Sequence, residues 1–210
     1  MLLPRMKEGV VEAGCDEAGR GCLCGPVVCA AVILPHDFEC EEINDSKQLS
    51  PEVRERLALL IKEKAIAWAV EFVEAAEIDK INILNASITG MHRAIARLRV
   101  RPEHLLIDGN RFKEYVDEEF RTIPHTTVVK GDGKYMSIAA ASILAKTSRD
   151  ELMKTLSKEF PGYGWERNMG YPTKEHMESL QRLGVTLHHR KTYGPVKMLL
   201  EETGIRGEIF

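Results

Sequence analysis

Acidic side chains follow apolar, strand-like segments at three separate places in this chain of 210 residues. The acids are Asp16 and Glu17 after residues 10–13, Asp108 after residues 104–107, and Asp132 after residues 126–129. If these strand ends converge, the carboxylates repel one another, and hard divalent ions such as Mg²⁺ or Mn²⁺ remove that repulsion. Two such ions can hold the attacking and leaving oxygens of a phosphodiester, so the pattern indicates metal-dependent hydrolysis.

Each of these acids also has a purely structural interpretation. Neighbouring side chains of a regular strand point to opposite faces, so Asp16 and Glu17 share a site only if the chain bends near them. They are otherwise solvated turn residues. Asp108 begins the turn sequence Asp-Gly-Asn, and Asp132 could cap the helix that follows it. The combination of acids favours a shared site more strongly than any single one of them.

Asp150 competes with Asp132 for the place of the fourth carboxylate. It lies on one helical stripe with Lys146 and Arg149, and we interpret it as a local ion-pair partner. The sequence leaves open which of the two aspartates belongs to the site.

The glycine-rich turn after Glu17 is the segment Gly19-Arg20-Gly21-Cys-Leu-Cys-Gly25. Its spacing is not the dinucleotide fingerprint, and it leads into a strand rather than a helix, which disfavours a small-molecule oxidoreductase. Backbone N–H groups of such a turn can still face a ligand.

Basic and aromatic residues could contact a polyanion. Tyr171 lies between Gly170 and Pro172, where its ring could stack on a sugar or base, although an isolated tyrosine more often packs internally. Lys47 and Lys146 are assigned to substrate binding. The full set of basic candidates for phosphate contacts is Lys47, Lys130, Lys134, Lys146, Arg149, Lys174, Arg190 and Lys191.

Composition is that of an ordinary globular protein, with a formal net charge of −3 that is not typical of a nucleic-acid-binding domain. No segment approaches the roughly 20 apolar residues of a membrane span, and residues 1–4 are too short an apolar start for a signal peptide. We therefore expect a cytoplasmic protein with no membrane partner. The five cysteines lack a C-x-x-C pair, so we expect reduced thiols and no zinc site.

Periodicity predicts a mixed sheet flanked by helices, in one domain spanning residues 1–210, of which 161–210 form a C-terminal loop and helical extension. The predicted strands are 10–13, 27–34, 66–73, 104–107 and 126–129. The predicted helices are 51–63 after the N-cap Ser50, one continuous helix over 78–98, and the segments 137–145, 174–183 and 196–202. Residues 161–172 are predicted to form a loop.

Seven motifs, in order along nearly the whole chain, resemble those of bacterial ribonuclease HII, the type 2 ribonuclease H family. They are DEAGRG at 16–21, DSKQLS at 45–50, IDGN at 107–110, KGDGKY at 130–135, AASILAKTSRD at 140–150, MGYPTKEH at 169–176 and HHRKTYGPV at 188–196. One such match would be weak, whereas the ordered set is specific.

The resemblance implies a ribonuclease H-like α/β fold, a five-stranded mixed sheet with a C-terminal helical extension. By motif position it implies a site of four carboxylates, Asp16, Glu17, Asp108 and Asp132, which hold two Mn²⁺ or Mg²⁺ ions. It also implies hydrolysis on the 5′ side of ribonucleotides in RNA/DNA hybrids and of single ribonucleotides in duplex DNA. The products carry 3′-hydroxyl and 5′-phosphate ends.

In this family the glycine-rich turn and the motif tyrosine read the substrate. The backbone of Gly19, Arg20 and Gly21 contacts the 2′-hydroxyl, and Tyr171 stacks on the sugar of the following deoxynucleotide. The 2′-hydroxyl is the group that distinguishes RNA from DNA. The expected partners are therefore RNA/DNA hybrids and ribonucleotide-containing DNA duplexes, bound by a monomer.

Two other functions remain open. Another nuclease of the same fold, such as a resolvase-like enzyme, would share the acids without needing a 2′-hydroxyl reader. A hybrid-binding protein without catalysis is disfavoured because all four acids are present. The tail, residues 204–210, shows no convincing clamp-binding motif.

Overall fold

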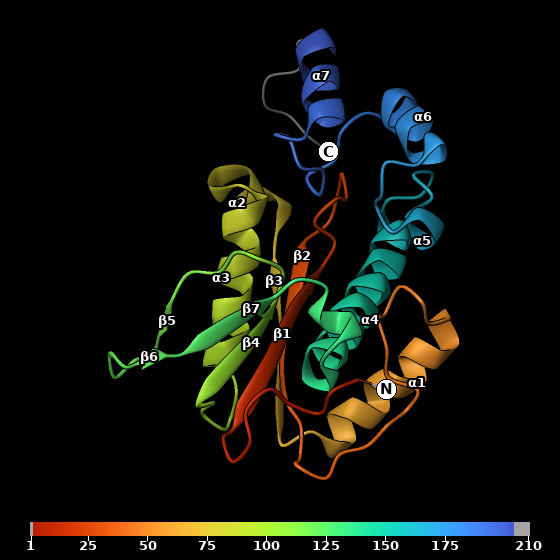
Figure 1. The fold of residues 1–210 in the computed structure, drawn as a ribbon. Helices are drawn as coiled ribbons and strands as arrows, with labels where there is room; N and C mark the ends of the chain where they lie inside the picture. Colours follow the sequence, from red (N-terminus) through yellow and green to blue (C-terminus); the bar gives the residue numbers. More distant parts are fainter. Residues whose placement is uncertain (1, 204–210) are drawn as a thin grey trace.

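The structure is a computed structural model that describes residues 2–203, and Figure 1 shows its fold. The tail in which no clamp-binding motif was found lies outside the described residues. The strands are β1 (Glu12–Ala18), β2 (Val27–Ile33), β3 (Ala67–Val73), β4 (His104–Asp108), β5 (Tyr115–Val116), β6 (Thr122–Ile123) and β7 (His125–Val128). The helices are α1 (Pro51–Lys64), α2 (Ala75–Ile81), α3 (Ile83–Ala96), α4 (Met136–Glu159), α5 (Trp165–Asn168), α6 (Lys174–Leu183) and α7 (Gly194–Thr203), with a 3₁₀ turn η1 (Gly131–Gly133).

Five strands form one mixed sheet in the order β3-β2-β1-β4-β7. β1 pairs with β2, and β2 with β3, in antiparallel ladders, whereas β4 runs parallel to both β1 and β7. This arrangement confirms the predicted mixed five-stranded sheet flanked by helices.

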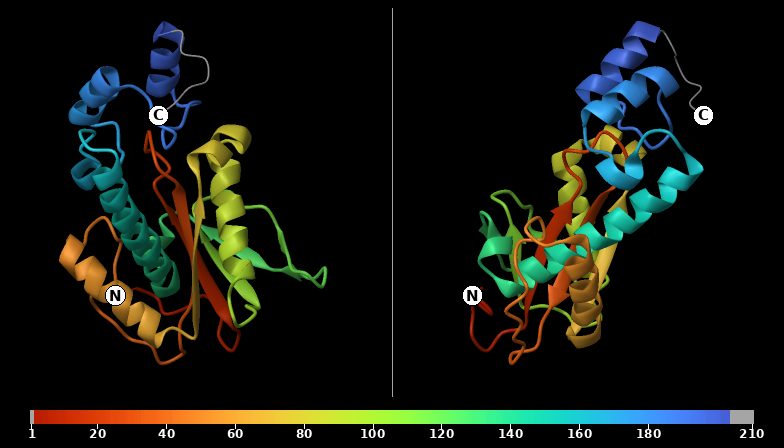
Figure 2. Two further views of the ribbon diagram at one scale, coloured as in Figure 1. Left: turned by 180° about the vertical axis from the view of Figure 1, so that it is seen from behind. Right: turned by 90° about the vertical axis from the view of Figure 1, so that its right-hand side faces the viewer.

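Helices cover both faces of the sheet (Figures 1 and 2). One core cluster joins the sheet to α3, with Cys29, Met91 and Ile107 among its buried members. The second joins the opposite face to α1 and α4, with Leu57 and Ala140 among its members. The alanine-rich helix lies very close to β1, because a Cβ at Gly14 would lie 2.2 Å from the backbone carbon of Ser137. The small residues of this segment permit that approach, as predicted.

The predicted continuous helix over 78–98 is wrong. The chain breaks at Asn82, which adopts a left-handed φ of 64°, and the Asn82 side chain accepts a hydrogen bond from the Asn85 N–H to begin α3. Ile78 before the break and Ile88 after it are both buried, so the helical spacing of apolar residues continues across the break. Periodicity alone therefore cannot detect the break.

Further elements differ from the sequence prediction. The helix predicted over 137–145 continues to residue 159 as α4. β1 extends over the polar residues to Ala18, because its antiparallel ladder with β2 continues through Ala18 and Val28. The β5–β6 hairpin was not predicted, since two-residue strands are too short to show alternation. The segment 161–172, predicted as loop, contains the short helix α5.

Helices α5, α6 and α7 gather at the end of the sheet where β1 leads into the glycine-rich turn (Figure 1). Leu23 of that turn packs with Leu180 of α6 and Val196 of α7. The C-terminal segment thus holds the turn in place. No helix among residues 2–203 is long and apolar enough to cross a bilayer.

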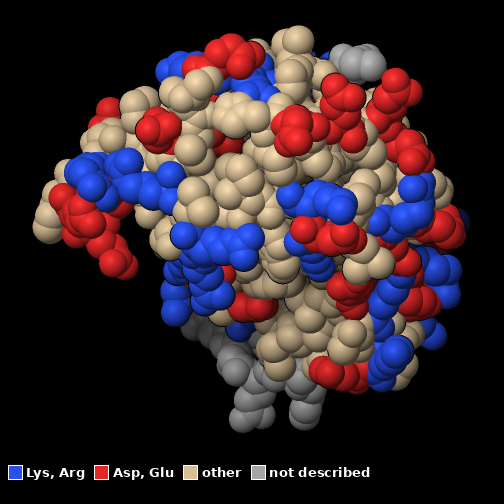
Figure 3. All heavy atoms as spheres, turned by 90° about the horizontal axis from the view of Figure 1, so that it is seen from below, with Lys and Arg blue, Asp and Glu red and all other residues tan. Residues whose placement is uncertain are grey.

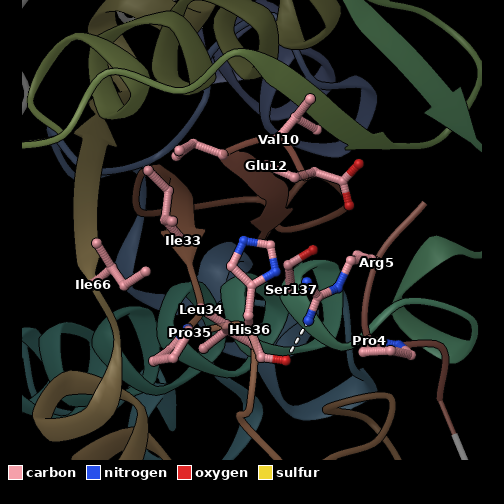
Figure 4. Close-up of a pocket in the computed structure, with 11 residues that line it drawn as sticks. Pro4, Arg5, Val10, Glu12, Ile33, Leu34, Pro35, His36, Ile66 and Ser137 are labelled. Carbon is pink, nitrogen blue, oxygen red and sulfur yellow. Dashed lines mark hydrogen bonds between the residues drawn. The ribbon is translucent and has the colours of Figure 1, made fainter. Parts of the chain in front are cut away.

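The opposite end of the sheet carries a small pocket of about 100 Å³ (Figure 4). Arg5, Glu12, His36 and Ser137 are among its lining residues, and Arg5 donates to the His36 carbonyl. Lys, Arg, Asp and Glu side chains are interspersed on the face seen from below in Figure 3. This face therefore presents no continuous basic surface to a polyanion.

Candidate active site

Asp16 and Asp108 lie on neighbouring parallel strands at the same edge of the sheet. Cys15 of β1 is paired with Ile107 of β4, so the next residue of each strand is an aspartate. Because side chains alternate, both aspartates face the side of the sheet covered by α4. Asp16 is buried and accepts a hydrogen bond of 2.7 Å from the Glu17 N–H.

Glu17 joins this site from the other face of β1. The strand does not bend to allow this, contrary to the expectation from sequence, since the ladder with β2 continues through Ala18 and Val28. Instead, Glu17 and Asp108 both line a pocket of about 280 Å³ beside α3. Glu17 and Asp108 start from opposite faces of the sheet. They can meet because each lies near the end of its strand, where the sheet no longer stands between their side chains.

Asp132 lies beside Asp108, in the turn between β7 and α4. The Gly131 N–H donates to Asp108 Oδ1 over 2.6 Å, which fixes the turn against the end of β4. Asp132 Oδ2 is 3.7 Å from the ammonium nitrogen of Lys47, which supplies a positive charge at the rim.

Asp150 is held elsewhere by two cations. Its Oδ1 accepts from Lys146 Nζ at 2.7 Å and its Oδ2 from Arg54 Nη2 at 3.2 Å. This confirms its interpretation as a local ion-pair partner. The structure therefore brings Asp132, and not Asp150, next to Asp108.

The site carboxylates are electrostatically strained. Burial raises the pKa of Asp16 well above its usual value, and Glu17 and Asp108 raise it further. Burial likewise raises the pKa of Asp132, with Asp108 and Asp45 adding to the effect. For Glu17, burial raises the pKa against the opposing attraction of Arg20. These four carboxyl groups influence one another at the same end of the sheet and form an all-oxygen donor set, which fits hard divalent cations.

The glycine-rich turn and Tyr171 lie next to each other beside these carboxylates. The Leu23 N–H donates to the Gly170 carbonyl over 2.8 Å, and a Cβ at Gly21 would lie 4.0 Å from the Tyr171 ring. The ring is 40% exposed, and Lys146 Nζ is 5.8 Å from its centroid. Arg20 reaches back to Glu17 with an ion pair of 3.1 Å. The predicted substrate-contacting residues therefore border the carboxylate site.

Arg149 and Arg190, two of the basic candidates for phosphate contacts, do not contact solvent. Both are 0% exposed, and their guanidinium groups donate to backbone carbonyls of the glycine-rich turn and its neighbours. For Arg149 the sequence did indicate burial, because this residue lies on the same helical stripe as Ser142 and Ala145, and that stripe faces the sheet.

A second cluster joins Cys24, His176 and His189, whose potential ligand atoms lie within 4.8 Å of one another. The lone pair of His176 Nε2 already accepts from the Trp165 indole N–H over 3.0 Å, and His176 Nδ1 lies 2.9 Å from the Tyr171 carbonyl. His189 Nδ1 accepts from the Thr186 backbone N–H, so its Nε2 carries the proton and shares the His176 Nε2 lone pair with the indole N–H, over 3.3 Å. These bonds satisfy both imidazoles as neutral groups, so the cluster is a hydrogen-bond network that holds the backbone at Tyr171.

Acidification should weaken this network. Burial lowers the pKa of His189 to about 3, below the value of about 6.5 in an unfolded chain. The unfolded state therefore gains a proton first, and the stability contribution present above pH 6.5 is lost progressively towards pH 3. Between pH 7.5 and 5.5 the expected loss is about 1.4 kcal/mol.

Urea unfolding of the wild type and of His189→Gln at both pH values measures this loss. The carboxylates with raised pKa values act in the opposite direction, but they are present in both proteins and cancel in the comparison. The stability gap between the two proteins should therefore shrink at pH 5.5. An unchanged gap would show that His189 is not held neutral.

Comparison with known proteins gives concordant results. The sequence model of the family described as Ribonuclease HII matches residues 13–194. The ribonuclease HII of Parabacteroides distasonis is 64% identical over 193 residues, covering 92% of this chain and 94% of that protein. The crystal structure of ribonuclease H2 from Pyrococcus horikoshii OT3 superposes with a TM-score of 0.76 at 25% identity, covering 93% of this chain and 99% of that one. Bst-RNase HIII in complex with Mn²⁺ shares the fold, with a TM-score of 0.68 at 22% identity over 92% of this chain and 70% of that one.

Proposed function

The chain belongs to the ribonuclease HII family and is a metal-dependent endoribonuclease, and from that premise we propose which of its residues recognise and cleave the substrate. The substrates are RNA/DNA hybrids and DNA duplexes that contain single ribonucleotides. The cut falls on the 5′ side of the ribonucleotide and leaves 3′-hydroxyl and 5′-phosphate ends.

The observation that carries the assignment of the site is the convergence of four carboxyl groups from β1, β4 and the turn before α4. Asp16, Glu17, Asp108 and Asp132 would hold two divalent ions, Mn²⁺ or Mg²⁺. When bound, such ions supply Lewis acidity and a nucleophile usable at neutral pH. The chain's own carboxylates would position these ions, and two of the four, Asp16 and Asp132, are buried.

The neighbouring residues would bind and orient the nucleic acid. Backbone N–H groups of the turn at Gly19, Arg20 and Gly21 receive the 2′-hydroxyl, and the exposed face of Tyr171 stacks on the next sugar. Lys47 and Lys146 lie on either side and reduce the repulsion between the acidic site and the phosphates. Local positive groups suffice here, which is compatible with the net charge of −3. We further propose that the protein acts as a monomer in the cytoplasm.

The function is tested with an end-labelled DNA duplex that carries one ribonucleotide, incubated with Mn²⁺ or Mg²⁺ beside an all-DNA control. We expect one cut, on the 5′ side of the ribonucleotide, and none in the control. Cleavage of all-DNA junctions instead would favour a resolvase-like nuclease. Binding of the ribonucleotide duplex by folded protein without cleavage in either ion would favour a non-catalytic hybrid-binding protein.

Replacement of Tyr171 by alanine should weaken cleavage at single ribonucleotides more than cleavage of long hybrids. One stacked ring contributes roughly 1–3 kcal/mol, which corresponds to about 5- to 150-fold in kcat/KM. Long hybrids offer many ribonucleotides and depend less on one junction. Tyr171→Phe keeps the ring and is the matched control, with expected loss under about threefold. Equal losses on both substrates by Tyr171→Ala would remove its role at the junction.

A further inference from the structure

The glycine-rich turn is held from behind by one buried cation. Arg190 is 0% exposed and all five of its N–H groups are used. They donate to the carbonyls of Gly19 (2.8 Å), Arg20 (2.9 Å) and Gly25 (3.0 and 2.9 Å) and to the Tyr193 hydroxyl (3.0 Å).

These bonds fix the direction of two peptide groups. In a trans peptide the carbonyl and the following N–H point in opposite directions. Because the carbonyls of Gly19 and Arg20 point inward to Arg190, the N–H groups of Arg20 and Gly21 point outward. Among residues 2–203 neither of these N–H groups has a protein acceptor. The turn thus presents two free, parallel donors next to Glu17 and Tyr171, an arrangement suited to an oxygen ligand.

Burying the charged Arg190 guanidinium costs free energy, so its position points to a role other than stabilising the fold. Within the described part of the chain no carboxylate lies within salt-bridge distance of its guanidinium, so its charge is compensated only by carbonyl and hydroxyl dipoles. An unpaired buried charge is a weak source of stability. A guanidinium is, however, a rigid planar fork that can orient several carbonyls at once, which a lysine ammonium cannot do.

The segment that carries Arg190 is itself anchored at both sides. Tyr193 donates to the Arg20 carbonyl over 2.7 Å, and its ring centroid lies 5.1 Å from the Arg190 guanidinium carbon. Asp79 of α2 accepts from the backbone N–H groups of Lys191 and Thr192, each over 2.9 Å. The turn cannot rotate the Gly19 and Arg20 peptides without breaking their hydrogen bonds to Arg190 and Tyr193.

We propose that Arg190 is a positioning residue for substrate discrimination: it orients the Arg20 and Gly21 N–H groups that receive the 2′-hydroxyl of the ribonucleotide. The inference rests on the proposed function of the turn. It predicts that substituting Arg190 reduces the preference for a ribonucleotide over a deoxynucleotide, and not merely the stability of the fold.

The preference is measured as the ratio of two dissociation constants, for an all-DNA duplex and for the same duplex with one ribonucleotide. Both are determined by fluorescence anisotropy in an Asp16→Asn background, which binds without cutting. Arg190→Lys should lower the ratio by about tenfold, the value of one or two lost hydrogen bonds, while affinity for the all-DNA duplex changes little. Tyr193→Phe removes the hydroxyl that donates to the Arg20 carbonyl and accepts from Arg190; it is the milder variant and should lower the ratio by about threefold.

His104→Gln is the matched control for a purely structural effect. His104 is equally buried and hydrogen-bonded, to Glu12 at 2.9 Å and Thr126 at 3.0 Å, but it lies at the opposite end of the sheet. It should lose stability and keep the ratio. Partial rescue of Arg190→Ala by methylguanidinium, seen as a higher ratio, would support the positioning role.

Failure of the inference is distinguishable from failure of the proposed function. If the Asp16→Asn protein with native Arg190 shows no preference for the ribonucleotide, the function assigned to the turn is wrong. If it shows the preference and both Arg190→Lys and Tyr193→Phe keep the full ratio, Arg190 does not orient the donors.

Discussion

Replacement of Asp16 by asparagine is expected to lower kcat at least about 10³-fold, a loss of about 4 kcal/mol in transition-state stabilisation. The same substitution should raise the stability of the metal-free protein. Burial, Glu17 and Asp108 all disfavour the charged form of Asp16, and a neutral amide of the same shape relieves that repulsion. A gain of about 1 kcal/mol would raise the melting temperature by roughly 2–4 °C for a chain of this length.

The two readouts are steady-state cleavage of the single-ribonucleotide duplex and thermal unfolding in the presence of a chelator. Because the folded pKa of Asp16 lies above its unfolded value, the wild type gains stability as pH falls towards the unfolded pKa. The advantage of Asp16→Asn should therefore be largest at neutral pH and shrink on acidification. Added Mn²⁺ should stabilise the wild type more than the variant.

Asp117→Asn is the matched control. The backbone N–H of Arg121 lowers the pKa of Asp117, and hydrogen bonds from the Arg101 and Arg121 side chains lower it further. Its carboxylate is therefore stabilising in the charged form, so the control variant should lose stability and keep its cleavage rate. Normal turnover by Asp16→Asn would exclude Asp16 from the site.

Substitution of Asp132 and of Asp150 should have opposite consequences, which settles the choice that sequence left open. Asp132→Asn removes a carboxylate that lies beside Asp108, so kcat should fall by at least about 10²-fold with little loss of stability. Asp150→Asn leaves Arg54 and Lys146 without their partner. Breaking a buried ion pair in this way costs about 3–5 kcal/mol, whereas cleavage should fall less than about tenfold.

The comparison requires both variants to be assayed at a temperature where each is folded, verified by circular dichroism. Arg54→Met in the Asp150→Asn background removes one of the unpaired charges and should recover part of the lost stability. Should Asp150→Asn abolish cleavage while Asp132→Asn remains active, the assignment of the fourth carboxylate would be reversed.

The sequence determined the parts of this protein that depend on short-range pattern. Ser50 is followed by Pro51 and caps α1 in the structure, where its hydroxyl accepts from the Val53 N–H over 3.3 Å. Alanines 139–141 indicated a helix that lies close to the sheet, and they are fully buried against it. The four acids of the proposed site could also be selected from sequence, because each lies in a short motif next to a predicted strand or turn.

Tertiary structure alone decided which of these groups meet. Glu17 shares a site with Asp108 without a bend in β1, because both stand at the ends of adjacent strands. The break at Asn82 is invisible to periodicity, since the apolar stripe continues on both sides. Motif position favoured Asp132 over Asp150 as the fourth carboxylate, but the sequence left the choice open, and the two differ in the folded chain by their neighbours.

Arg190 shows the physical reason for this division most clearly. Its guanidinium bonds to a carbonyl 171 residues earlier in the chain. In sequence it is one basic residue among several near the C-terminus, with a charge that suggests solvent or phosphate. Periodicity, capping and turn chemistry act over a few residues and are written into the local sequence. The burial of a charged side chain against distant carbonyls depends on how the whole chain packs, and only the folded protein specifies it.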